Sequence, residues 1–92
     1  MTLMTIPLEK AANQRISFIV DNLRWVLTLR TRLGKLYASV ENNRDGVIIQ
    51  NRVCLNNTPI IKQLVFIDLN GHDDPVYSGL NSRFFLVYND EA

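Results

Sequence analysis

The stretch ISFIVDNLRWVLTLRTRLGKLYASVENNRDGVII, residues 16–49, decides the fold because apolar and polar residues alternate along most of it. The alternation is interrupted only at DN, RLG and NRDG, which are typical of tight turns. Successive side chains of a β-strand point to opposite faces. The pattern therefore predicts half-buried antiparallel strands joined by short turns.

Residues 23–31, LRWVLTLRT, show the alternation most clearly. Leucines and the tryptophan take one face of the expected strand, while Arg24 and Arg30 lie on the other. A helix of the same sequence would scatter these arginines around its surface and leave no continuous apolar stripe. We therefore expect a strand with one buried face and one solvent-facing, basic face.

Further strands are expected at residues 15–20, 35–42, 47–55 and 82–90, of which the third range holds one strand or two. DN at residues 21–22 is expected to form a two-residue hairpin turn. No internal repeat or linker separates these segments.

The segment PIIKQLVFI, residues 59–67, is compatible with a short helix or with a strand. Pro59 suits the first position of a helix, whereas the β-branched residues that follow it favour a strand. The polar segment NGHDDP, residues 70–75, is expected to be a loop.

These segments together predict an all-β fold, a small antiparallel sandwich or barrel of about six to eight short strands. A chain of 92 residues has the length of one domain, residues 1–92. We expect residues 1–5 and 89–92 to be flexible or to be ordered by a partner.

The composition argues against two classes of function, dedicated nucleic-acid binding and membrane insertion. Ten Lys and Arg against nine Asp and Glu give a formal charge of +1, without the basic excess of a dedicated nucleic-acid binder. No apolar run approaches the roughly 20 residues needed to cross a bilayer, and the N-terminal residues lack the pattern of a signal peptide. We expect the protein to be made and kept in a cytoplasm, or packaged from one.

No catalytic constellation is apparent. His72, beside Asp73 and Asp74, could act as an oriented general base, but no nucleophile can be assigned to it and the loop is expected to be solvated. Cys54 lies in an apolar pattern and is expected to be a buried, inert thiol. One cysteine and one histidine cannot fill a tetrahedral zinc shell without carboxylates or a second chain, so we expect no metal site and no cofactor. Because catalytic partners are missing as well, we expect no enzyme activity.

The basic face is the candidate site. Arg24, Arg30 and Arg32 share strand parity, and Tyr37 is expected on the same face of the next strand. Such a face could stack bases and contact phosphates as an OB-fold does, could simply be solvated, or could bind another protein. The balanced charge argues against nucleic acid, and Arg and Tyr are both enriched in protein interfaces.

Four segments in order resemble the baseplate plug family of contractile-tailed bacteriophages: IPL (6–8), NQRISFIVDNLRWVLTLR (13–30), LYASVENNRDGVIIQNRVCLNNTPII (36–61) and DDPVYSGLNSRFFLVY (73–88). The resemblance spans about Ile6 to Tyr88. The chain departs from the family at DN, where Asp-Gly is favoured, and at GLNS, where Gly79 precedes the leucine instead of following it.

The resemblance implies a small all-β structural protein of the virion, without catalytic residues. It would lie in the tail baseplate, in several copies, and contact the hub and spike, the tail tube and the wedge proteins. Arg24, Arg30, Arg32 and Tyr37 would be interface residues, and no membrane contact is expected. The alternative function from a different class is an OB-like module that binds single-stranded nucleic acid.

Overall fold

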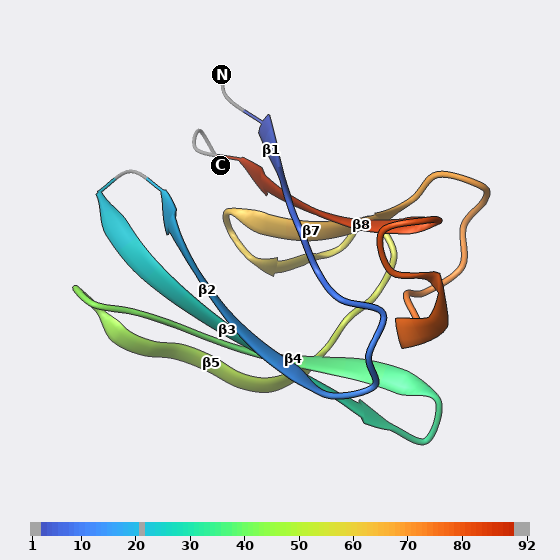
Figure 1. Cartoon of the computed structure of the whole chain (residues 1–92), viewed down its shortest axis with the longest axis horizontal. Helices are drawn as coiled ribbons and strands as arrows, with labels where there is room; N and C mark the ends of the chain where they lie inside the picture. The colour runs from blue at the N-terminus through green and yellow to red at the C-terminus, as the bar shows by residue number, and fades with distance from the viewer. Residues whose placement is uncertain (1–2, 21, 90–92) are drawn as a thin grey trace.

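The computed structural model describes residues 3–20 and 22–89, which form two four-stranded antiparallel sheets packed face to face (Figure 1). In sheet order, the first contains β1 (Leu3–Ile6), β8 (Phe84–Asn89), β7 (Leu64–Asp68) and β6 (Pro59–Ile61). The second contains β2 (Gln14–Val20), β3 (Leu23–Arg32), β4 (Lys35–Asn42) and β5 (Gly46–Val53). The predicted all-β sandwich is confirmed.

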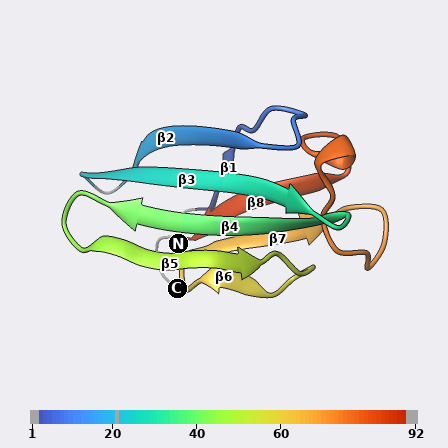
Figure 2. The same cartoon turned by 90° about the horizontal axis from the view of Figure 1, so that it is seen from below.

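The second sheet is a simple meander, because each strand pairs with the next along the chain (Figure 2). Leu33 and Gly34 connect β3 to β4 with φ angles of 52° and 77°, and Arg32 pairs with Lys35 on either side of them. Two positive φ values suit the twist of a two-residue hairpin. At the DN turn, Asn22 has a φ of 61°, whereas Asp21 lies outside the described residues.

The core lies between the sheets and is built from the apolar positions of the alternating strands. It includes Trp25, Leu27 and Leu29 of β3, Leu36, Ala38 and Val40 of β4, Leu64 and Phe66 of β7, and Leu86 and Tyr88 of β8. Each large apolar side chain that is fully buried stabilises the fold by about 1.5–3 kcal/mol.

Trp25 joins the two sheets at one end of this core and is only 2% exposed. Its ring lies 6.4 Å from Phe18 of the neighbouring β2 and 5.7 Å, edge to face, from Tyr88 of the opposite sheet. The indole Nε1 is buried and has no hydrogen-bond partner among the described residues. Packing area and ring contacts, not a hydrogen bond, therefore hold this side chain in place.

Residues 59–67 form strands, as their β-branched content favoured. Pro59–Ile61 is β6 and Leu64–Asp68 is β7, joined by a two-residue turn at Lys62 and Gln63. Residues 69–76 are a loop that leads to a single 3-10 turn, η1 (Tyr77–Gly79). The described residues contain no helix long and apolar enough to cross a membrane.

Residues 3–5 lie in the N-terminal segment that was expected to be flexible or ordered by a partner, and they belong to a strand. Leu3–Ile6 forms β1 and pairs with β8 of the same chain, with Leu3 opposite Asn89 and Ile6 opposite Leu86. Ile6 and Leu8 are buried, so apolar burial accompanies this pairing. Asn89 belongs to β8, whereas residues 1–2 and 90–92 lie outside the described residues.

The unusual position of Gly79 has a steric explanation. A Cβ added at Gly79 would lie 2.6 Å from Cδ2 of Phe84, a buried ring at the start of β8. A Cβ at Gly71 in the preceding loop would meet nothing closer than 3.5 Å. Only the absence of a side chain at Gly79 lets the 3-10 turn close over Phe84.

We predict that Gly79→Ala lowers the free energy of unfolding by about 1–3 kcal/mol, because the methyl group overpacks a full site. Gly71→Ala is the matched control and is expected to have little effect. Urea denaturation followed by circular dichroism measures both variants. Equal stabilities for the two variants would contradict the steric explanation.

Candidate protein interface

The outward face of the β2–β5 sheet carries a surplus of positive charge. Arg15, Arg24, Arg30, Arg32 and Lys35 are all exposed on it, and we call these five residues the basic face. Glu41 is the only acidic residue in the four strands. This arrangement follows from the alternation, because the residues between these positions face the core.

The sheet is hollowed on this side. An open depression of about 890 Å³ lies over its outer face, and its lining includes Arg15, Arg30, Arg32, Tyr37, Ser39 and Glu41. A concave surface with several cations and an aromatic ring can enclose an acidic loop or chain segment of another protein more completely than a flat sheet can.

The structure brings together three of the four predicted site residues. Arg30 lies directly opposite Tyr37 in the β3–β4 ladder, and Arg32 lies one outward position further along β3, opposite Lys35. Arg24 is six residues away from Arg30 along the strand, roughly 20 Å at the rise of an extended chain. It lies opposite Ile19 at the other end of the face and does not line the hollow.

Two charged residues of the lining, Arg15 and Glu41, were not singled out from the sequence. The sequence alone indicates that both residues face outward on their strands. That they lie close to each other depends on how β2, β3 and β4 pair. Arg15 Nη2 lies 3.9 Å from a Glu41 carboxylate oxygen, and both side chains are largely exposed. An exposed pair at this distance adds little stability, so it leaves Arg15 available to a partner.

The remaining arginines of the basic face have unsatisfied charge. Within the described part of the chain, the guanidinium groups of Arg24, Arg30 and Arg32 form no ion pair and no hydrogen bond. Arg52 differs, because its Nη1 donates a hydrogen bond to the Ile60 carbonyl at 2.8 Å and so links β5 to β6. Among the described residues, the charges of Arg24, Arg30 and Arg32 therefore have no partner inside the fold.

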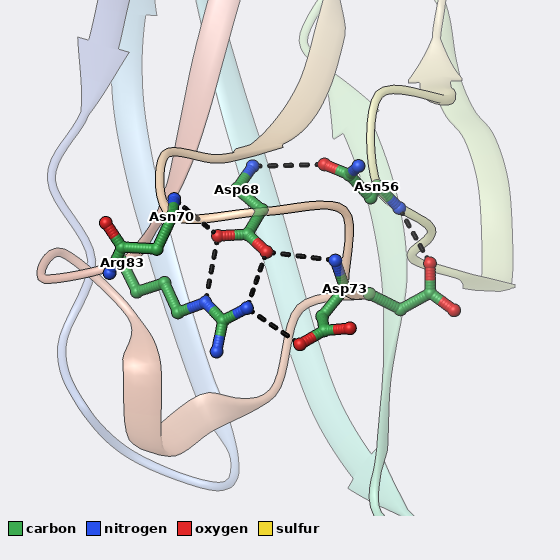
Figure 3. A network of polar contacts seen from close by, with 6 residues as sticks. Asn56, Asp68, Asn70, Asp73 and Arg83 are labelled. Carbon is green, nitrogen blue, oxygen red and sulfur yellow. Dashed lines mark hydrogen bonds and ion pairs between the residues drawn. The ribbon is translucent and has the colours of Figure 1, made fainter.

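In contrast to the arginines of the basic face, Asp68 and Arg83 are paired with each other inside the fold, in what we call the Asp68–Arg83 network (Figure 3). Asp68 accepts hydrogen bonds from Nε and Nη2 of Arg83 at 2.9 and 2.8 Å. Its two oxygens also accept the backbone N–H groups of Asn70 and Asp73, each at 2.9 Å. Arg83 Nη2 additionally contacts the Asp73 carboxylate at 2.7 Å.

This network fixes the loop that contains His72. The Asp74 carboxylate accepts the backbone N–H of Asn56 at 2.9 Å, and the Asn56 side chain accepts the N–H of Asp68 at 3.0 Å. Both acids beside His72 are thus engaged with the scaffold and not with the imidazole. Nor do the described residues contain a cluster of three side chains suited to bind a metal.

The hydrogen bonds from Arg83 hold the pKa of the Asp68 carboxyl well below its ordinary value, and the backbone N–H donors of Asp73 and Asn70 add to this effect. The same contacts, with those of Asp73, raise the pKa of Arg83. Because the folded-state pKa of Asp68 is lowered, its contribution to stability is present above the unfolded pKa near 4. It is lost as the pH falls from about 5 through the folded pKa.

We predict that Asp68→Asn lowers Tm at pH 7 by about 10 °C or more, because the amide NH₂ would face the donors of Arg83 and Asp73. Between pH 5 and pH 2 the variant should lose less stability than the wild type does, since the titrating carboxyl is absent. Thermal denaturation across this pH range, with the more exposed Asp73→Asn as the control, measures both effects. Parallel pH profiles for wild type and Asp68→Asn would contradict the assignment.

Cys54 is buried directly after β5, and this burial raises the pKa of its thiol to about 12. The thiolate, which is the reactive form, is therefore nearly absent at neutral pH. This environment agrees with the expected inert thiol.

We predict that Cys54 reacts with a disulfide reagent at pH 8 roughly a thousandfold more slowly in the folded protein than in denaturant, as the thiolate fraction requires. The release of the coloured thiol product measures both rates. Similar rates in the two conditions would show that the thiol is accessible in the native state.

Comparison with known protein families gives a match over most of the chain. A family model described as "Cyanophage baseplate Pam3 plug gp18" matches residues 3–91. The comparison with curated proteins gave no match. The family match extends over both sheets, so it includes the hollow, the basic face and the Asp68–Arg83 network.

Proposed function

The chain belongs to the cyanophage baseplate plug family, and from this premise we propose that it joins the hub and spike, the tail tube and the wedge proteins of a contractile-tail baseplate. Its role in the baseplate is structural. The proposed contacts are protein–protein contacts, and the absence of catalysis is part of the proposal.

The observation that carries the proposal is the basic face, on which Arg24, Arg30 and Arg32 form no ion pair within the described chain. The acids Asp68 and Asp73 are paired with Arg83 inside the fold, whereas arginines stay exposed around the hollow. Such a surface is suited to bind an acidic surface of a partner protein. Arg30, Arg32 and Tyr37 form the proposed centre of this contact, and Arg24 contacts a partner at the other end of the face.

Several copies of the protein in one particle would together bind more tightly than a single copy does. We propose that several copies are arranged around the tail axis, so that modest contacts per copy add up through effective concentration. Contacts between exposed charged residues form and break readily. This property suits a component that holds the extended tail and is released or displaced at contraction. The protein would be made in the cytoplasm of the host bacterium and would act in the virion.

The OB-like alternative receives less support from the architecture. An OB-fold is a five-stranded, partly open barrel, whereas this chain forms two four-stranded sheets. Tyr37 is the only aromatic residue in the lining of the hollow, and binding of single strands usually combines charge with several stacking rings.

We predict that Arg30→Glu/Arg32→Glu lowers the number of copies per particle at least severalfold, because the partner's acids would then face acids. The variant replaces the wild-type protein during particle assembly, and quantitative mass spectrometry of purified particles measures copies relative to the tube protein. Arg30→Glu alone should have a smaller effect. Arg24→Glu tests the other end of the face separately.

Lys62→Glu is the matched control, because it reverses one exposed charge on the other sheet, in the β6–β7 turn. Unchanged Tm values would confirm that the variants fold. Normal copy number and infectivity of the double variant would refute the proposed interface. Steeply salt-dependent binding of a labelled single-stranded oligonucleotide by the wild type would instead favour the alternative function.

A further inference from the structure

The edge strand β2 is unprotected, unlike the other three sheet edges. β1 has four residues and β6 has three, beginning with Pro59. β5 has an irregular register against β4, and Arg52 bonds it to the neighbouring β6. β2 pairs all seven of its residues with β3 without a bulge and lies at the free margin of its sheet (Figure 2). Natural edge strands are normally short, irregular or charged, because a long regular edge invites another strand.

The hydrogen-bonding pattern shows which groups of β2 are unpaired. Along β3, the Arg24 carbonyl accepts the Asn43 N–H on the β4 side, whereas the Thr31 N–H donates to Asn13 on the β2 side. Residues of one parity in a strand bond to the same neighbour. The odd residues of β3 therefore bond to β2, and their partners are the even residues of β2. Arg15, Ser17 and Ile19 direct their N–H and C=O groups to the free edge.

We propose that β2 pairs antiparallel with β2 of a second copy of this chain, centred on Ser17. The register that uses the whole strand sets Gln14 opposite Val20 of the copy, and it therefore sets Ser17 opposite Ser17. In this register the three residues with unpaired backbone groups meet one another: Arg15 lies opposite Ile19, and Ile19 opposite Arg15. Each such pair exchanges two backbone hydrogen bonds.

The side chains agree with this register on both faces. On the core side, Ile16 would lie opposite Phe18 of the copy, and both are half-buried residues at the margin of the core that the added strand would cover. On the outer side, Arg15 would lie opposite Ile19, which is 74% exposed in the single chain. No like charges meet directly, and Arg15 keeps Glu41 close to it.

The contact would join the two β2–β5 sheets into one continuous sheet with a two-fold axis at Ser17. Such an interface is isologous, the commonest kind in soluble oligomers. It leaves the basic face of each copy open on the same side of the joined sheet. Arg15 belongs to both surfaces, whereas Arg30, Arg32 and Tyr37 lie on β3 and β4, away from the paired edge.

Charge substitutions at Ile19 test the register. Ile19→Lys would oppose Arg15 of the copy, twice per dimer, and is expected to weaken dimerisation, whereas Ile19→Glu would attract it. With two such pairs per dimer, the dissociation constant should change by roughly 2- to 30-fold in each direction. Arg15→Glu/Ile19→Lys, which exchanges the charges, should restore tight pairing. Sedimentation equilibrium of the full chain at low salt measures all four proteins.

Backbone substitutions at Ser17 provide an independent test. Ser17→Pro removes an N–H that points to the free edge and not to β3, so it should abolish the dimer, whereas Ser17→Ala keeps the N–H and should not. Circular dichroism and Tm establish whether each variant folds. If Ser17→Pro does not fold, the Ile19 variants alone test the proposed dimer. A wild-type chain that stays monomeric to millimolar concentration would overturn the proposal. So would a dimer with the same dissociation constant in Ile19→Lys and Ile19→Glu.

Discussion

The packing of two sheets through alternate residues of β3 and β4 is the constraint on which the rest of the molecule depends. Leu27 and Leu29 are fully buried, while Thr28 and Arg30 between and beside them face outward. Because the period of a strand is two, a slip of one residue would bury Arg30 and expose Leu29. The core therefore fixes the register, and the register places the charges of the basic face on one side of the sheet.

Two kinds of polar residue result from this arrangement. Asp68 is buried and is satisfied by Arg83 and by two backbone N–H groups, so it orders the loop after β7 and fastens it to the segment before β8. Arg30 and Arg32 are exposed and have no such partners in the described chain. The buried charge of Asp68 thus stabilises the fold, whereas the exposed charges of Arg30 and Arg32 are free to bind a partner.

Much of this arrangement could be predicted from local pattern. Residues 16–49 alternate so regularly that the hairpins of β2–β5 and the outward side of Arg30, Arg32 and Tyr37 followed from parity alone. Features that depend on distant pairing could not be predicted. β1 forms because β8, whose paired residues come 80 to 86 positions later in the chain, offers an edge. The contact between Asp68 and Arg83 and the separation of Arg24 from the hollow likewise depend on the folded topology.

Trp25 gives the molecule an optical property of its own. It is the only tryptophan in the chain, and its ring contacts Phe18 on one sheet and Tyr88 on the other. Its intrinsic fluorescence therefore originates entirely from the seam between the sheets, in an apolar environment shielded from water. A red shift of the emission would report that this seam opens, whereas contacts at the outer face would leave the indole shielded. Sheet separation and surface binding can thus be distinguished in an unlabelled sample.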